Sequence, residues 1–201
     1  MLNTDDVHPE SPAHGTDGGR RAQLVDAAVD HVAAHGIADL SLRRLGAAIG
    51  VSHRMLIHYF GSKEQLLVEI VRTSERRQRD LLSRLRLEPG LSPANVARRL
   101  WQQLTDPGLA GQERLFFEIY GHALRGRLEA ALVVEGLVTD WLEPLVAAEM
   151  TAGADPVAAR NRARLGLATV RGLLLDLLAT GDRAGVDAAM EEFLRLYYGS
   201  E

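Results

Sequence analysis

The sequence SLRRLGAAIGVSHRMLIHYFGSKEQLL occupies residues 41–67 and predicts two short helices joined by a tight turn, followed by the start of a third helix. Ser41, Ser52 and Ser62 each precede a helical pattern, where a serine hydroxyl can accept a hydrogen bond from a first-turn amide. Gly50 follows the first helix, where a residue with positive φ ends a helix at little steric cost. This punctuation predicts a helix-turn-helix.

The second helix of this stretch has apolar residues, Leu56 and Phe60, on one side and polar or flexible residues on the other. In a helix-turn-helix, the second helix enters the major groove of DNA. An arginine there can bind a guanine edge through two hydrogen bonds, and an apolar side chain can contact a thymine methyl group. The alternative is an ordinary helical hairpin with a solvated polar face. The outward residues are His53, Arg54, Met55 and His58.

Three runs within residues 21–67 resemble the DNA-binding domain of the TetR family of bacterial repressors. Residues 24–36 read LVDAAVDHVAAHG, where the family has the pattern I-L-D-A-A-x-x-x-F-A-x-x-G. Residues 40–52 read LSLRRLGAAIGVS, which is similar to T-[ST]-V-x-x-I-A-x-x-A-G-V-S. Residues 53–66 read HRMLIHYFGSKEQL, which is similar to K-G-[AT]-L-Y-x-[HY]-F-x-[SN]-K-x-x-L. The resemblance implies a dimeric, ligand-responsive DNA-binding protein.

The chain departs from the family pattern at two positions. Ile57 stands where the family usually has a tyrosine that contacts a phosphate, so that contact is expected to be missing. Arg54 stands where glycine or alanine is common, which adds a cation to the groove-facing side. The residues predicted to bind DNA, from the resemblance and from their outward position, are Ser41, Arg43, Ser52, His53, Arg54, Met55, His58, Tyr59 and Lys63.

The distribution of charge supports a nucleic-acid partner for one part of the chain only. The whole chain carries a formal net charge of −4, but residues 20–90 hold twelve Lys and Arg against eight Asp and Glu. Residues 91–201 hold eleven against fifteen, and residues 1–19 carry four acids and no Lys or Arg. The basic excess therefore coincides with the predicted helix-turn-helix, as a phosphate-facing module requires.

Composition sets further limits. The chain has no Cys, which excludes disulfides and thiolate metal sites. His31 and His35 are spaced as a helical zinc pair would be, but no third ligand is evident, so we expect no metal and no cofactor. The first residues lack an apolar signal segment and no apolar run could span a bilayer, so we expect a cytoplasmic protein without a membrane partner. Residues 1–19 are polar and rich in Gly, and are predicted to be disordered.

The remaining patterns predict helices over residues 20–35, 63–87, 93–105, 112–124, 126–150 and 156–180, and a final helix carrying Phe193. The Arg-rich stretch 72–86, with Glu75 and Asp80 interleaved, predicts a solvated face with ion pairs. The predicted fold is therefore all-α. It comprises a disordered tail (1–19), a three-helix helix-turn-helix domain (20–67) and a helical ligand-binding and dimerisation domain (68–201).

Two further sites are predicted in the second domain. Small and apolar residues recur at alternating spacings of four and three, as in a helix–helix seam, and the resemblance implies that the last two helices pair in a homodimer. An internal core seam is the alternative. The predicted interface residues are Ala159, Ala163, Gly166, Val170, Leu173, Leu177 and Phe193. The resemblance also implies an effector pocket among the middle helices, with plain core as the alternative. The predicted ligand-binding residues are Trp101, Phe117, Tyr120, His122 and Trp141.

No nucleophile motif, phosphate-binding glycine loop or metal cluster is present in the sequence, so we predict that the protein is not an enzyme. The functional prediction is a regulator, specifically a repressor that an unidentified small-molecule effector releases from a pseudo-palindromic operator in double-stranded DNA. The alternative is an all-helical enzyme or carrier that uses the middle cavity and has a secondary DNA-binding head.

Overall fold

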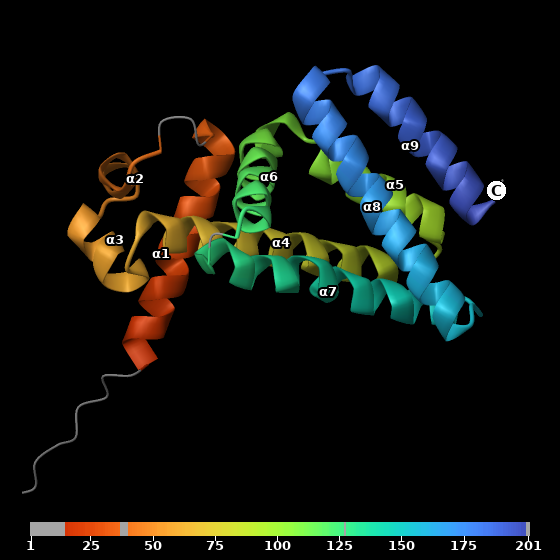
Figure 1. The fold of residues 1–201 in the computed structure, drawn as a ribbon, viewed down its shortest axis with the longest axis horizontal. Coiled ribbons are helices and arrows are strands. Elements are labelled where there is room, and N and C mark those ends of the chain that lie inside the picture. The colour runs from red at the N-terminus through yellow and green to blue at the C-terminus, as the bar shows by residue number, and fades with distance from the viewer. Residues whose placement is uncertain (1–14, 37–39, 127, 200–201) are drawn as a thin grey trace, which may run out of the picture.

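The computed structural model describes residues 15–36, 40–126 and 128–199, which form helices and no strand, so the all-α prediction is confirmed. Figure 1 shows α1, α2 and α3 at one end of the molecule, with α8 and α9 towards the other. Among the described residues, no helix is long and apolar enough to cross a membrane. The helices are α1 (Gly15–His35), α2 (Leu42–Ala48), α3 (His53–Phe60), α4 (Lys63–Leu87), α5 (Pro93–Leu104), α6 (Ala110–Leu124), α7 (Leu128–Thr151), α8 (Pro156–Thr180) and α9 (Arg183–Tyr198), with a 3-10 turn η1 (Pro107–Leu109) before α6.

The predicted punctuation of the helix-turn-helix is confirmed. The hydroxyls of Ser41, Ser52 and Ser62 each accept a hydrogen bond from the backbone amide three residues later, at 3.0 to 3.2 Å. These bonds satisfy amide groups at the starts of α2, α3 and α4 that have no partner within the helix. Gly50 has a φ of 74° and closes the turn between α2 and α3.

Helix α1 begins at Gly15, earlier than the predicted start at Arg20. Residues 15–19 therefore belong to the helix and not to a disordered tail, while residues 1–14 of that prediction lie outside the described residues. Asp17 lies in the first turn, where a negative charge interacts favourably with the amide end of the helix. Its carboxylate also bonds to the hydroxyl of Tyr59, which raises the pKa of that hydroxyl. These two interactions extend the helix beyond its apolar pattern.

One hydrophobic core joins the helix-turn-helix to the helices that follow it. Val32 of α1, Leu56 of α3, Ile70 of α4 and Leu115 of α6 are all fully or almost fully buried in it. The predicted boundary after residue 67 lies inside α4, so the two predicted domains share both a helix and a core. Since the packing is continuous across residue 67, we propose this boundary as a division between DNA binding and ligand binding and not between separately packed domains.

The charged middle of α4 has the predicted solvated face with ion pairs, except at Glu75. Arg77 lies 2.8 Å from Asp26 and 2.9 Å from Asp30 of α1. Glu75, expected on the solvated face, is only 5% exposed. The prediction was wrong for Glu75 because the stretch 72–86 contacts helices on more than one side, which its composition alone does not reveal.

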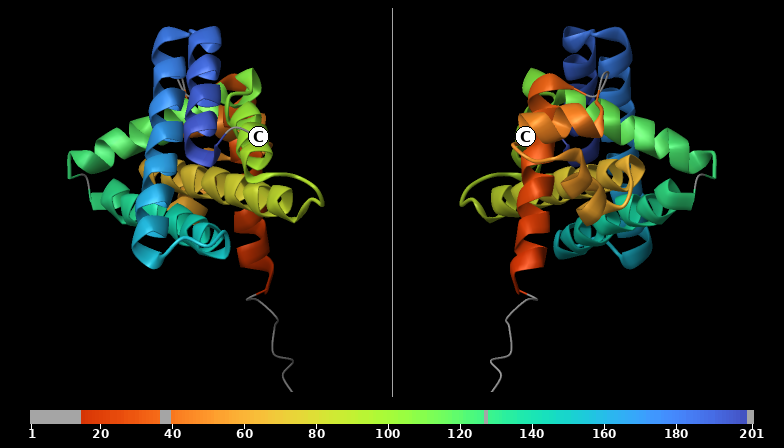
Figure 2. Two further views of the ribbon diagram at one scale, coloured as in Figure 1. Left: turned by 90° about the vertical axis from the view of Figure 1, so that its right-hand side faces the viewer. Right: turned by 90° about the vertical axis from the view of Figure 1, so that its left-hand side faces the viewer.

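Helices α8 and α9 lie side by side (Figure 2), and α5 packs against α9. Trp101 of α5 is buried with Leu174 of α8 and Met190 of α9. The indole N–H of Trp101 donates to the carboxylate of Asp187 at 2.7 Å, so the polar atom of this large buried side chain is satisfied.

The first turn of α6 lies directly against the last turns of α1. A Cβ built on Gly111 would lie 2.6 Å from the carbonyl oxygen of Val32 and 2.9 Å from the Cα of Gly36. The neighbouring Gln112 donates from its side-chain amide to the carbonyl oxygen of Val29 at 3.3 Å. Both contacts are to backbone atoms, so only a residue without a side chain fits at position 111.

We predict that Gly111→Ala lowers the free energy of unfolding by roughly 1–3 kcal/mol, because the added methyl group overlaps backbone that cannot rotate away. Gly121→Ala is the matched control on the same helix, since its Cβ would meet nothing within 4 Å. The control should be stabilising by about 0.5–1 kcal/mol, as expected for alanine in place of glycine within a helix. Urea denaturation followed by circular dichroism measures both. Equal stability of the two variants would contradict the close contact.

Candidate functional site

The outward side of α3 carries the predicted base-reading residues together. His53, Arg54 and His58 are exposed, and Met55 is 36% exposed. Ile57 is also 40% exposed beside them. Leu56 and Phe60, on the opposite side of α3, are buried in the core and fix the position of the helix that carries the exposed side chains. This surface has the polar, cationic and apolar groups that can read base edges.

The other predicted DNA-contacting residues surround α3 in different environments. Arg43 of α2 is exposed, and Lys63 is half-buried at the start of α4. Ser41 and Ser52 are occupied as helix caps. Tyr59 is half-buried against the core, and its hydroxyl bonds to Asp17, so a contact from Tyr59 to phosphate would compete with that bond.

A cavity of about 740 Å³ lies among α4, α5, α7, α8 and α9, with a contribution from α6. Of the predicted ligand-binding residues, Trp101 and Trp141 line this large cavity, and Phe117, Tyr120 and His122 do not. Phe116 lines it in place of its neighbour Phe117. The helical spacing identified an aromatic helix but did not resolve which of two adjacent aromatic faces points inward.

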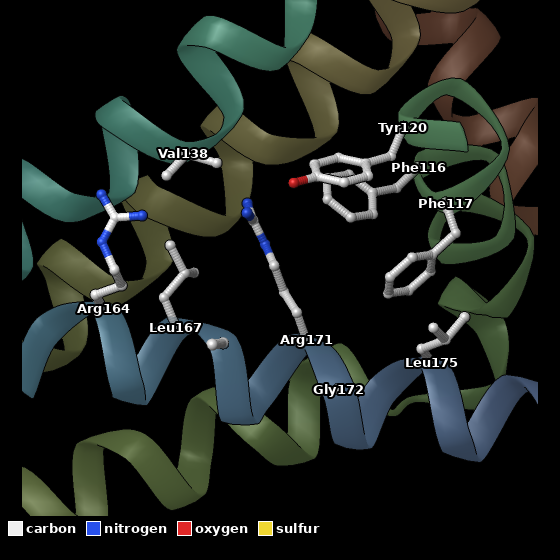
Figure 3. Close-up of a pocket in the computed structure, with 10 residues that line it drawn as sticks. Phe116, Phe117, Tyr120, Val138, Arg164, Leu167, Arg171, Gly172 and Leu175 are labelled. Atoms are coloured by element: carbon white, nitrogen blue, oxygen red, sulfur yellow. The ribbon is translucent and has the colours of Figure 1, made fainter. Parts of the chain in front are cut away.

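Phe117 and Tyr120 instead line a smaller outer pocket of about 300 Å³ between α6, α7 and α8. Figure 3 shows the side chain of Arg171 reaching from α8 towards the rings of α6. The guanidinium carbon of Arg171 lies 5.1 Å from the centre of the Phe116 ring, within the range of a cation–π interaction. Arg171 and Phe116 line both cavities and form part of the wall between them.

Glu75 is the first of two buried carboxyl groups that line the large cavity. It accepts a hydrogen bond from the indole of Trp141 at 2.6 Å, and the guanidinium of Arg171 lies 3.5 Å away. Burial raises the pKa of Glu75, and the positive charge of Arg171 opposes that rise. Arg171 also donates to the carbonyl oxygen of Leu137 at 2.6 Å, which fixes the guanidinium beside Glu75.

Glu113 is the second buried carboxyl, only 3% exposed, and it lies at the start of α6. Its hydrogen-bond partner is the side-chain amide of Gln78, at 2.6 Å. Burial, reinforced by the nearby charge of Glu75, raises the pKa of Glu113 to about 8. In the described part of the chain, no Lys or Arg lies within ion-pair distance of Glu113. The group is therefore mostly uncharged at neutral pH.

Glu113 is not among the residues predicted from the sequence. Another acid of the same helix, Glu118, is exposed. A signal for Glu113 was present, because it precedes Phe116 by three residues and Tyr120 by seven and so lies on their side of the helix. This position, on the same side of the helix as the aromatic residues, distinguishes Glu113 from Glu118.

The predicted dimer residues of α8 lie largely inside the chain. Ala159 is fully buried and Ala163 is 2% exposed, while Gly166 faces the ring of Tyr197. Val170, Leu173, Leu177 and Phe193 pack against the core around Trp101. The assignment of Ala159 and Ala163 to a subunit interface was wrong, because this inner seam joins α8 to its own chain.

Helix α8 has a second seam on its opposite side. Leu165 and Leu175 are 58% and 50% exposed, and a Cβ on Gly172 would meet nothing within 4 Å. Together with Ala168 and Ala179, these residues recur at alternating spacings of three and four, as in a helix–helix interface. This outer seam consists of Leu165, Ala168, Gly172, Leu175 and Ala179, and all five are exposed.

The arrangement agrees with what the chain resembles. Residues 24–70 match the family model described as bacterial regulatory proteins, tetR family. Over its helix-turn-helix, the chain is thus similar to the TetR family. The HTH-type transcriptional regulator BetI of Agrobacterium fabrum is 40% identical over 62 residues, which cover 31% of this chain and 30% of BetI. BetI of Stenotrophomonas maltophilia is 29% identical over 89 residues, 44% of this chain and 45% of that protein. The chain thus spans less than half the length of these curated relatives.

Solved structures extend the likeness to most of the chain. A transcriptional regulator from Rhodococcus sp. superimposes with a TM-score of 0.70 at 23% identity, covering 88% of this chain and 95% of that one. Salmonella enterica GusR gives a TM-score of 0.63 at 25% identity, with 89% and 95% covered. The multidrug binding protein EbrR, solved with imidazole, gives 0.58 at 26% identity, with 94% and 97% covered. The likeness to the Rhodococcus protein shows the fold alone.

Proposed function

We propose that this protein is a DNA-binding transcriptional regulator of the TetR family, and specifically a repressor that a small molecule releases from its operator. The single observation that carries the proposal is the exposed face of α3, with Arg54 and Met55 presented on a capped, well-packed helix. One hydrophobic core connects α3 to α4 and α6, which both contribute to the wall of the large cavity.

The mechanism follows from differential binding. In a dimer, two α3 helices would enter successive major grooves and read the two halves of a pseudo-palindrome. A ligand can weaken DNA binding only if it binds more tightly to a conformation in which the two heads are wrongly spaced. Helix α4 bounds the cavity, and its first turns pack against α1 and α3. One helix therefore links the occupancy of the cavity to the position of the helix-turn-helix.

An enzyme or carrier is the second candidate, because Glu75 and Glu113 place two carboxyl groups at one cavity. Glu75 is held by Trp141 and Arg171, which leaves only Glu113 without an ionic partner in the described part of the chain. This arrangement suits binding better than catalysis by a pair of free acids. Sustained chemical turnover of a bound ligand would favour the second candidate over the first.

The test of the regulator is selection of bound sites from random double-stranded DNA by the purified protein. We expect recovered sites with two related half-sites about one helical turn apart, and affinity that falls steeply with salt as Arg43 and Lys63 displace counterions. Footprinting on the DNA upstream of its own gene then identifies a natural operator. Recovery of no common sequence, together with no binding at low salt, would contradict the proposal.

Arg54 provides a sharper prediction, since it lies exposed in the first turn of α3. We expect Arg54→Ala to cost roughly 1–3 kcal/mol in binding and to relax preference at one position of each half-site, as loss of a guanine contact would. A phosphate contact would instead weaken binding to all sequences alike and reduce the salt slope by about one unit. Arg125→Ala, remote from α3 at the end of α6, is the control and should leave site preference unchanged.

We also propose that the dimer forms through the outer seam of α8. Its leucines remain exposed in the single chain, and Gly172 leaves room for a second helix to approach closely. The inner seam is already used within the chain. A two-fold axis would set the outer seams of two copies against each other, with α9 beside them as the resemblance implies.

We predict that Leu165→Glu converts the dimer into a monomer, because it places a charge in an apolar seam. Since Leu165 is exposed in the single chain, the variant should keep its helical content. Leu87→Glu is the control, as Leu87 is 83% exposed at the far end of α4. Sedimentation velocity distinguishes the two states. A Leu165→Glu protein that remains a dimer would place the interface elsewhere.

A further inference from the structure

The charges around the large cavity are unevenly distributed along its length. At one end, the carboxyl groups of Glu75 and Glu113 are accompanied by one guanidinium, that of Arg171. At the other end, Glu149 pairs with Arg162 at 2.6 Å, and Arg86 donates to the carbonyl oxygen of Pro144. Glu75 and Arg86 are eleven residues apart on α4, which corresponds to about 16 Å along a helix. The two ends therefore act on a ligand independently.

The end near Glu113 holds one carboxyl more than its positive charges can balance. Arg171 is committed to Glu75 and to the carbonyl oxygen of Leu137. The groups that act on Glu113 are Glu75 and Gln78 of α4 and Arg171 of α8, and Gln78 supplies a hydrogen bond without charge. From α7 and α4, Asp140 and Arg79 act on Glu75, with opposite signs. A proton on Glu113 balances this end in the empty cavity, and a bound positive charge would balance it equally well.

We propose that the large cavity binds an organic cation whose positive group pairs with the carboxylate of Glu113 and whose apolar body lies among the surrounding aromatic and aliphatic side chains. The inference rests on the proposed function, in that it names the chemical class of the effector. The apolar wall suits such a body and includes Leu100, Trp101, Leu104, Phe116, Val170 and Met190. A primary ammonium or a larger alkylammonium group has the required charge.

Binding of a cation at Glu113 requires that carboxyl to lose its proton. The bound proton is released to solvent as the ammonium group arrives, so the charge of this end is unchanged. Below the pKa of about 8, each unit of falling pH should therefore weaken cation binding about tenfold, and above it the affinity should level off. A neutral ligand of the same shape displaces no proton and should bind with the same affinity across this range.

The test compares phenylpropylammonium, phenylpropanol and phenylpropanoate, which share one aromatic body, by calorimetry on the full chain without DNA. An alkylammonium stays protonated between about pH 6 and pH 8, as a lysine side chain does. We expect the ammonium probe to bind at least tenfold more tightly than the alcohol at pH 8, with release of about half a proton, and to lose most of that advantage at pH 6, where binding releases about one proton. Equal binding of ammonium and alcohol, tighter binding of the carboxylate, or no binding at millimolar concentration would each overturn the proposal.

The variant Glu113→Gln should abolish both the preference for the ammonium probe and its pH dependence. It should fold, because the uncharged Glu113 of the empty cavity is already similar to glutamine and Gln78 can still donate to the side-chain oxygen. Glu118→Gln removes the same charge from an exposed position on α6 and should change neither property. An ammonium preference that persists in Glu113→Gln would overturn the assignment.

A parallel measurement with operator DNA separates this inference from the proposed function. If the ammonium probe binds as described but leaves DNA affinity unchanged, the ligand class holds and the role of the ligand as effector fails. If the protein binds DNA but shows no preference for the ammonium probe, the regulator stands and the cation inference fails.

Discussion

The packing of α4 against α1 and α3 at one end, and around the large cavity at the other, is the constraint on which the rest of the structure depends. Ile70 and Val71 are buried in the core of the helix-turn-helix, while Glu75, Gln78 and Leu82 line the cavity only a few residues later. A helix is a stiff element, so these two surfaces cannot move separately over so short a distance. The helix-turn-helix is thus held by the same helix that lines the cavity.

The buried acids illustrate how a charge is tolerated inside such a core. An unpaired ion in an apolar interior is expensive, whereas a carboxyl that takes up a proton avoids most of that cost. Glu75 is accommodated through Trp141 and Arg171, and Glu113 through its raised pKa. The two solutions differ in one respect that matters for binding, because a salt bridge is already satisfied and a protonated acid can exchange its proton for another positive group.

The positions of the helices could be predicted from the sequence, but the contacts between helices could not. The serine caps, the turn glycine and the ends of α5 and α8 followed from local chemistry, since each depends on residues a few positions apart. The inner and outer seams of α8 have the same periodicity, so no local pattern could say which one faces the chain. The burial of Glu113 depends on how α6 rotates against α4, which is set by contacts far apart in the sequence. The extension of α1 to Gly15 likewise depends on Tyr59, more than forty residues away.

The close contact at Gly111 has a mechanical consequence. Gly111 touches the backbone of α1, Gln112 binds the carbonyl of Val29, and Glu113 lines the cavity, so three consecutive residues connect the two regions. No flexible side chain lies between Gly111 and α1 to absorb a displacement, and close-packed interiors have low compressibility. The contact between α6 and α1 is therefore stiff, and we expect a shift of the first turn of α6 to displace the end of α1 with it.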